Sequence, residues 1–436
     1  MKRIGYKLLL ASTLSMSCTA AIAERLTIAT VNNGDMIRMQ QLSADFSAKY
    51  PDIELEWVTL EENVLRQRVT TDIANNGGQY DVMTIGTYEV PIWGKQGWLV
   101  SLNDLSDSYD VDDLLPAIRG GLTVDGELYA APFYGESSMV MYRTDLMEKA
   151  GMTMPEAPTW TFIRDAALAM TDQAAGIYGA CLRGKAGWGE NMAFLTATAN
   201  SFGARWFDMD WNAQFDSPQW KQTLTFYVEL MQQAGPPDAT GNGFNENLEL
   251  FQNGKCGLWI DATVAASFVT NPAESKVAGK VGFALAPDNG LGKRSNWLWA
   301  WSLAIPAGTR NADSAKKFVE WATSKDYLAL VAEKEGWANV PPGTRTSLYE
   351  NPEYAKIPFA KMTLDSINGS DPHDPTVEEV PYVGVQFVAI PEFQNIATAV
   401  GQQFSAALSG TISIDDALSN AQALTMREMQ KVGYPK

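Results

Sequence analysis

Histidine is almost missing from the 436 residues, and its scarcity narrows the chemistry open to the protein. The single histidine, His373, lies in residues 369–375, where two prolines and a glycine indicate a surface loop rather than an active site. One histidine cannot build the usual zinc site, and the two cysteines that follow residue 23, which can be oxidised to a disulfide, do not complete one. The sequence also lacks a Gly-x-Ser-x-Gly elbow, a phosphate-binding loop and a dinucleotide fingerprint. We therefore expect no metal, no cofactor and no catalytic residue of these classes.

Long apolar runs are also missing, and after the N-terminus no stretch is long enough to span a bilayer. Lys2, Arg3 and Lys7 precede a short apolar run, and Ala21 to Ala23 supply the small residues of a cleavage site. This pattern is typical of a secretory signal peptide, which we expect to occupy residues 1–23 and to be cleaved near Ala23. Cys18 follows a poor lipid-attachment box, so we expect a soluble periplasmic protein rather than a lipoprotein.

Positive charge is scarce in the chain that remains after cleavage, with 30 basic and 51 acidic side chains and a net charge of −21. Such a surface repels nucleic acid and anionic membranes, and it suits a protein that stays soluble at high concentration. We therefore expect no nucleic-acid partner, and we expect a monomer.

Only two cysteines follow the cleavage site, Cys181 and Cys256. In an oxidising compartment they can form a disulfide, and the alternative is a pair of buried thiols.

Alternating strand and helix patterns predict an α/β fold. Apolar side chains alternate in residues 25–31 and 53–57 and recur at helical spacing from Met36 to Tyr50, which predicts a parallel strand pair joined by a helix. A helix over residues 65–73 and a strand over 80–85 continue the pattern, and two amphipathic helices end the chain, over 393–408 and 418–429. A chain of this length exceeds one compact core, so we expect two lobes.

Two loops follow predicted strands at the place where α/β sheets bind ligands, beyond the carboxyl ends of the strands. They are residues 32–35 and 86–89. Asn33 and Asp35 in the first loop are candidates for ligand contact, and helix capping is the alternative for both.

Five segments in sequence order carry a family resemblance: residues 80–83 with 93–99, 126–133 with 141–146, 253–261, 299–306 and 315–324. Together they resemble the extracellular solute-binding proteins of the maltose-binding type, the capture components of ABC importers. Four further segments resemble the sorbitol- and mannitol-binding subgroup: residues 187–194, 243–247, 259–263 and 381–387.

The resemblance implies two α/β lobes joined by hinge crossings, each made of separate segments. Residues 24–133 and 303–345 would form the N-terminal lobe, and residues 134–302 and 346–436 the C-terminal lobe. The lobes would close on a ligand and deliver it to the permease subunits of the importer.

A linear polyol needs acceptors and donors for its hydroxyls and apolar faces for its C–H groups, which carboxylates, amides, arginine and indoles provide. Tyr134 and Glu136 fit at the first crossing, and an ordinary exposed loop is the alternative. Trp259 and Asp261 lie two residues apart near a strand end, so both can face one side.

Four further candidates come from the resemblance to the family. Trp299 and Trp301 lie two residues apart at the return crossing, so their side chains point to the same side. Arg345 lies near a third crossing, and Asp81 opens a strand near the cleft. The alternatives are core packing for the tryptophans, bracing of the hinge for Arg345 and a structural role for Asp81. Weaker candidates are Lys185, Trp188, Asn245, Gln386 and Gln394.

The sequence therefore predicts a non-enzymatic periplasmic binding protein for sorbitol, mannitol or arabitol. Three alternatives remain open at this point: a binding protein for a mono- or disaccharide, a glycoside hydrolase acting through two carboxylates, and a secreted adhesion or structural protein.

Overall fold

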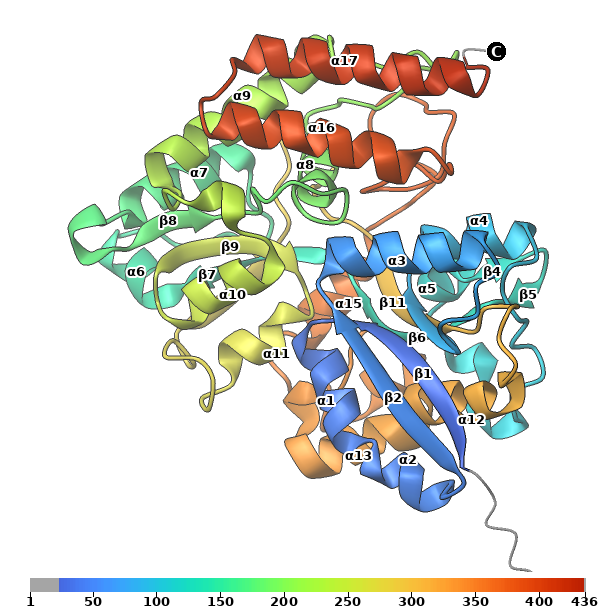
Figure 1. Cartoon of the computed structure of the whole chain (residues 1–436). Helices are drawn as coiled ribbons and strands as arrows, with labels where there is room; N and C mark the ends of the chain where they lie inside the picture. The colour runs from blue at the N-terminus through green and yellow to red at the C-terminus, as the bar shows by residue number, and fades with distance from the viewer. Residues whose placement is uncertain (1–22, 435–436) are drawn as a thin grey trace, which may run out of the picture.

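Two main β-sheets, one in each lobe, organise residues 23–434, the part of the chain that the computed structural model describes (Figure 1). The first sheet has the strand order β2-β1-β3-β11-β6. Its strands are β1 (Glu24–Val31), β2 (Ile53–Leu60), β3 (Val82–Ile85), β6 (Ala130–Glu136) and β11 (Trp299–Ala304). β1 pairs in parallel with β2 and β3, as the alternating pattern predicted, and β11 joins β3 and β6 antiparallel.

Helices from both ends of the first-lobe sequence surround this sheet. They are α1 (Gly34–Leu42), α2 (Ala44–Lys49), α3 (Glu62–Ala74), α4 (Glu89–Lys95), α5 (Pro116–Gly121), α12 (Ala312–Thr323) and α13 (Lys325–Glu335), beside the hairpin of β4 (Thr123–Val124) and β5 (Glu127–Leu128). The single helix expected over residues 36–50 is divided at Ser43. Its hydroxyl and its N–H both donate to the Gln40 carbonyl, which turns the chain between α1 and α2.

The second sheet has the order β10-β7-β9-β8. Its strands are β7 (Ser138–Arg143), β8 (Tyr178–Cys181), β9 (Cys256–Ala262) and β10 (Val281–Leu285). Every residue of β9 is buried, since the strand lies inside the sheet and its faces are covered. Surrounding helices are α6 (Thr144–Lys149), α7 (Trp160–Met170), α8 (Asn191–Ser201), α9 (Pro218–Ala234), α10 (Phe244–Gln252) and α11 (Ala265–Thr270).

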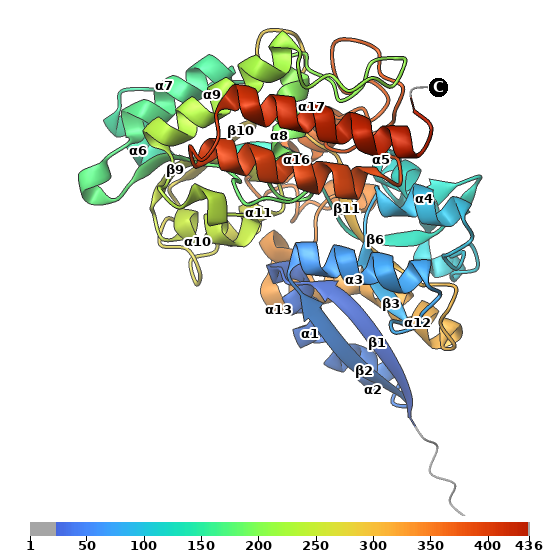
Figure 2. The same cartoon turned by 45° about the horizontal axis from the view of Figure 1, so that its top comes forward.

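Two helices follow the first-lobe helices α12 and α13 in the chain. They are α14 (Thr346–Glu350) and α15 (Ala360–Asn368). The two expected C-terminal helices are present as α16 (Phe393–Leu408) and α17 (Ile414–Lys431), side by side on the second lobe in both views (Figures 1 and 2). A disulfide joins Cys181 to Cys256 at the adjacent strands β8 and β9, with 5.8 Å between the Cα atoms. No helix within residues 23–434 is long and apolar enough to cross a membrane.

The crossings between the lobes follow directly from the strands. β6 ends at Glu136 in the first sheet, and β7 begins at Ser138 in the second, so that Ser137 is the link between them. The predicted lobe boundaries at 133/134 and 302/303 fall inside β6 and β11 and stay predictions. We propose instead that the chain changes lobe at Ser137 and near Leu298. The predicted signal peptide lies outside the described residues, apart from Ala23.

Candidate ligand-binding site

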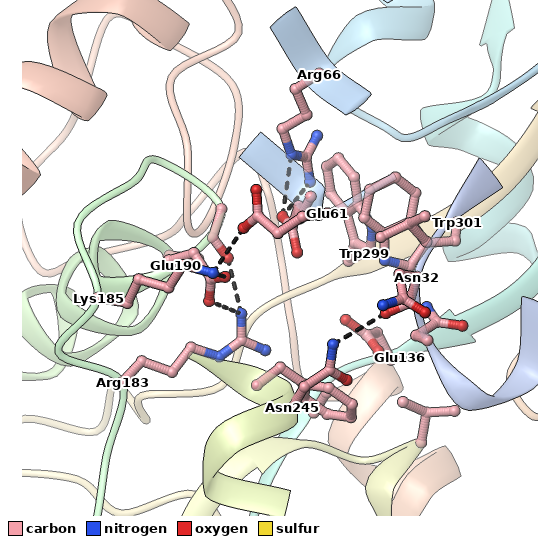
Figure 3. A pocket seen from close by; sticks show the side chains of 18 of the residues that line it. Asn32, Glu61, Arg66, Glu136, Arg183, Lys185, Glu190, Asn245, Trp299 and Trp301 are labelled. Atoms are coloured by element: carbon pink, nitrogen blue, oxygen red, sulfur yellow. Dashed lines mark hydrogen bonds and ion pairs between the residues drawn. The ribbon is translucent and has the colours of Figure 1, made fainter. Parts of the chain in front are cut away.

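A cavity of about 160 Å³ lies between the lobes, beyond the carboxyl end of β1. Figure 3 shows Arg183, Lys185 and Glu190 approaching it from the second lobe, opposite Asn32, Trp299 and Trp301. Its lining consists of Val31, Asn32, Asn33, Glu61, Glu62, Arg66, Tyr134, Glu136, Arg183, Lys185, Trp188, Gly189, Glu190, Ala193, Phe244, Asn245, Glu246, Ala262, Val264, Trp297, Trp299, Trp301 and Gln386. Five of these side chains are glutamates and three are cations, so the wall carries an excess of acidic groups.

Arg183 is held rigidly at the second-lobe wall. Its Nε and Nη2 donate to the two carboxylate oxygens of Asp261, at 2.9 and 2.6 Å. Its Nη1 donates to the Gly189 carbonyl at 2.8 Å and lies 3.5 Å from a Glu190 oxygen. Because all three guanidinium nitrogens are engaged, the orientation of the charge is fixed before a ligand arrives.

Arg66 is the matching cation of the first lobe, on α3. It donates to Glu62 through Nε and Nη2, at 3.0 and 2.8 Å, and to Glu89 through Nη1 at 2.8 Å. Its guanidinium carbon lies 4.0 Å from the ring centre of Trp188, which belongs to the second lobe. Rings of Trp299 and Trp301 lie 4.9 and 4.6 Å away, so three indoles surround one buried cation.

Two glutamates at the cavity have strongly shifted proton affinity. Burial raises the pKa of Glu136 well above its usual range; the Asp261 and Glu62 carboxylates add to the rise, and Arg183 opposes it. Burial likewise raises the pKa of Glu190 to about 7, with Glu61 and Glu62 adding to the effect of burial and Arg183 and Lys185 opposing it. Both groups can therefore donate as well as accept hydrogen bonds, which suits hydroxyl ligands.

Asn33 serves two purposes at the end of β1. Its side-chain oxygen accepts from the Met36 N–H at 3.0 Å and caps α1, while its amide nitrogen donates to the Tyr134 hydroxyl at 2.8 Å. Capping and a place in the cavity wall are thus compatible in one residue.

The two lobes also bond to each other at the rim of the cavity. Lys185 of the second lobe lies 2.7 Å from a Glu61 oxygen of the first. The Asn245 amide donates to the Asn32 carbonyl at 3.0 Å, again from the second lobe to the first (Figure 3). These bonds can exist only when the lobes are close together.

The structure brings five of the ten sequence-predicted ligand residues to the cavity: Asn33, Tyr134, Glu136, Trp299 and Trp301. Of the weaker candidates, Lys185, Trp188, Asn245 and Gln386 line it as well, whereas Gln394 does not. Asn33 lies two residues beyond the end of β1, Tyr134 and Glu136 lie within the last three residues of β6, and Trp299 and Trp301 lie within the first three residues of β11.

Trp259 and Asp261 lie behind the cavity wall rather than in it. Both are completely buried, and the Trp259 indole N–H donates to Asp261 at 3.0 Å. Asp261 also accepts from Arg183 and from the Ala262 N–H, so each of its oxygens already has partners. Their placement argues against the predicted ligand contact and assigns them to the support of Arg183.

The remaining three candidates are engaged elsewhere in the first lobe. Asp35 pairs with Arg38 at 2.7 Å, and burial raises the pKa of Asp35 to about 6. Asp81 accepts from the Thr27 N–H at 2.8 Å and connects β1 to the segment after β11. Arg345 is fully buried and donates to the backbone carbonyl oxygens of Asp110 and Thr323, which fits the bracing alternative.

Several cavity residues were not anticipated from the sequence: Glu61, Glu62, Arg66, Arg183, Glu190, Phe244 and Trp297. One local signal existed for Arg183, which lies two positions after Cys181, the last residue of β8. A charged side chain just beyond a buried strand is a candidate for the ligand edge of a sheet. The i,i+4 pair of Glu62 and Arg66 gives no such signal, because exposed helices carry many of them.

Comparison with known proteins identifies the class to which this architecture belongs. A family model described as bacterial extracellular solute-binding protein matches residues 33–329. A mannitol-binding protein of Pseudomonas aeruginosa is 56% identical over 428 residues, 98% of each chain. The chain therefore belongs to the bacterial extracellular solute-binding proteins, which bind solutes and are not enzymes, and the glycoside hydrolase alternative is set aside.

Solved structures agree with this assignment. The crystal structure of an ABC transporter solute-binding protein from Agrobacterium vitis with bound D-mannitol is 72% identical, with a TM-score of 0.94, covering 95% of this chain and 100% of that one. A maltose-bound protein of T. maritima is 24% identical with a TM-score of 0.78, covering 93% and 100%. The predicted two-lobed fold of the maltose-binding type is confirmed.

Proposed function

We propose that this protein binds D-mannitol, or a linear alditol of similar length, and delivers it to the membrane permease of an ABC importer. The observation that carries the proposal is the 72% identity to the Agrobacterium vitis protein whose structure holds D-mannitol. The geometry of the cavity supports the same ligand class on independent chemical grounds.

The cavity wall combines hydroxyl-binding groups with aromatic faces. Arg183 and Lys185 donate hydrogen bonds, whereas Glu136 and Glu190 can both donate and accept them. Indole faces of Trp299 and Trp301 can cover C–H groups. A ligand lacking one hydroxyl would leave a buried partner unpaired, which disfavours deoxy analogues.

Anionic ligands are disfavoured because a carboxylate or phosphate would need a free cation, and Arg66, Arg183 and Lys185 are each already paired with a carboxylate. We therefore expect neutral alditols to bind and sugar acids or sugar phosphates to be excluded.

A melting-temperature screen followed by isothermal titration calorimetry tests the proposal. With all ligands at one concentration, D-mannitol is expected to give the largest stabilisation, which is about 2.7 kcal/mol if that concentration is 100 times the dissociation constant of mannitol. D-sorbitol, D-arabitol, glucose, maltose and mannitol 1-phosphate complete the panel. The mono- or disaccharide alternative is favoured if glucose or maltose gives the largest shift, and the alditol proposal is wrong if no alditol binds.

A matched pair of variants assigns the binding to this cavity. Glu136→Ala removes a buried carboxyl from the wall and is expected to weaken mannitol binding at least about tenfold. Glu148→Ala makes the same change at an exposed glutamate of α6 and is expected to leave the affinity unchanged. If wild type and Glu136→Ala bind mannitol equally tightly, mannitol does not bind in this cavity.

The periplasmic location and the monomeric state are part of the same proposal. Export of the full chain should give a protein that begins at Glu24, which N-terminal sequencing of the periplasmic fraction measures. Size-exclusion chromatography with light scattering checks the monomer.

A further inference from the structure

Glycine lies on one side of three close contacts between the lobes. Gly34 begins α1 of the first lobe and faces Phe268 of α11, which belongs to the second lobe (Figure 1). On another edge, Gly187 and Gly189 of the second lobe face the first turn of α3 in the first lobe.

Each of these positions leaves no room for a side chain while the lobes are together. A Cβ on Gly34 would lie 2.2 Å from the Phe268 ring, and a Cβ on Gly187 would lie 2.4 Å from the side-chain oxygen of Asn63. On Gly189 it would lie 1.9 Å from a Glu62 oxygen. Real Cβ atoms do not approach other atoms so closely, so one partner would have to move.

The backbone itself does not require glycine at these three places. None of Gly34, Gly187 and Gly189 has φ in the left-handed region, where a side chain would be strained. The obstacle to a side chain comes from the opposite lobe. An alanine is therefore acceptable when the lobes are apart and clashes only when they close.

We propose that Gly34, Gly187 and Gly189 are clearance positions, places where the absence of a side chain allows the lobes to close. Through them the ease of closure sets the ligand affinity, although Gly34 and Gly187 do not touch the ligand. This inference rests on the proposed function, because it assumes that the lobes close on a bound solute. Gly34, Gly187, Phe268 and Asn63 all lie outside the cavity wall.

The contacts around these glycines stabilise the closed arrangement. The Arg38 guanidinium lies 5.4 Å from the Phe268 ring centre, and the Asn63 amide donates to the Ala186 carbonyl at 3.4 Å. A clash that exists only in the closed state lowers the population of that state in the absence of ligand. If the ligand binds only the closed state, its apparent affinity falls by the same factor as this population.

The test uses Gly34→Ala and Gly187→Ala in the full exported chain, with D-mannitol as the ligand. Gly34→Ala is expected to weaken affinity by about tenfold or more, because the bulky ring must be displaced. Gly187→Ala is expected to cost about two- to tenfold, since the Asn63 side chain can rotate at the loss of its hydrogen bond. Gly120→Ala and Gly241→Ala are matched controls, because no atom lies within 4 Å of their Cβ positions.

Two readouts separate closure from general damage. The melting temperature of the unliganded protein should stay unchanged or rise slightly, since alanine restricts the unfolded chain. Small-angle scattering at the mannitol concentration that half-saturates wild type should show Gly34→Ala less compact than wild type, and the difference should vanish when mannitol saturates both proteins.

Removing the opposing side chain should cancel the effect. In a Phe268→Ala background, the further change Gly34→Ala is expected to alter mannitol affinity less than about twofold relative to Phe268→Ala alone. The same is expected of Gly187→Ala in an Asn63→Ala background. The proposal is overturned if both single variants bind mannitol as tightly as wild type, or if the losses persist in these backgrounds. Failure of wild type itself to bind mannitol would instead contradict the proposed function.

Discussion

Replacing Asp261 by asparagine changes a completely buried carboxylate that accepts four hydrogen bonds. Two of them come from Arg183, and the others come from the Trp259 indole and the Ala262 backbone. An asparagine of the same size keeps one acceptor oxygen but turns an NH₂ group toward donors. Arg183 would then remain as a buried cation without its principal counter-charge.

The cost follows from the burial of the pair, whose side chains are only 6% and 0% exposed. Removing one partner of a buried ion pair costs about 3–5 kcal/mol. We expect the free energy of unfolding of the unliganded protein to fall by about 3 kcal/mol, the lower end, because Glu190 still lies 3.5 Å from Arg183. Mannitol affinity should fall tenfold to hundredfold as Arg183 loses its fixed position, about 1.5–3 kcal/mol for a charged hydrogen bond.

Urea unfolding of the unliganded protein and calorimetry with mannitol measure the two effects separately. Asp165→Asn is the matched control, because its pair with Arg164 is about half exposed, 52% and 46%. Exposed pairs contribute about 0–1 kcal/mol, so this variant should unfold and bind like wild type.

The two readings of Asp261 give different results. Direct ligand contact, as the sequence predicted, would weaken binding about tenfold to hundredfold while the unliganded stability stays within about 0.5 kcal/mol of wild type. The support of Arg183 requires both quantities to fall together. Loss of binding with unchanged stability would therefore refute the structural assignment.

Three further predictions concern groups outside the ligand contacts or at their edge. Thiol titration of the denatured, non-reduced protein should find no free thiol from Cys181 or Cys256, and reduction should lower the stability by about 4 kcal/mol or less for a cross-link spanning 75 residues. With the lobes together, the pKa of Glu190 is raised from 4.5 to about 7, so this folded state binds more protons than the unfolded chain and its stability should fall as pH rises from about 4.5 to 7. Glu190→Gln should make this fall smaller in urea titrations at pH 5 and 8. Arg345→Met should lower the free energy of unfolding by about 2–3 kcal/mol and change mannitol affinity less than twofold, since Arg345 is buried away from the cavity.

Local periodicity was sufficient to predict most of the N-terminal sheet and the C-terminal helices. Leu26 and Ile28 alternate with the more exposed Arg25 and Thr27 in the first half of β1, and one face of such a strand must be buried for the sheet to form. The division of the first helix at Ser43 could not be read this way, because one serine hydroxyl bonded to a carbonyl three residues earlier leaves the apolar spacing intact.

Neither position along a strand nor residue type was sufficient by itself to predict the cavity residues, since Asp261 also lies near the end of a strand, β9. Asn33, Glu136 and Trp299 lie where β1, β6 and β11 end or begin, and that place in the fold directs them toward the cavity. Asp81 and Asp261 are chemically equally suited to bind hydroxyls. Each instead accepts hydrogen bonds from groups that only the folded chain brings near, at sequence separations of 54 and 78 residues.

The role of Arg66 shows why the rest of the site could not be read from the sequence. Its Glu62 partner is four residues earlier on α3, the spacing of an ordinary exposed helical pair that contributes little. In the folded chain the Arg66 side chain is only 5% exposed, because Trp188 of the second lobe and Trp299 and Trp301 of the crossing strand cover it. Burial converts the same two residues from a weak surface pair into a fixed charge array, and only the approach of the second lobe completes that burial. The energetic weight of Arg66 therefore depends on closure, which no local pattern encodes.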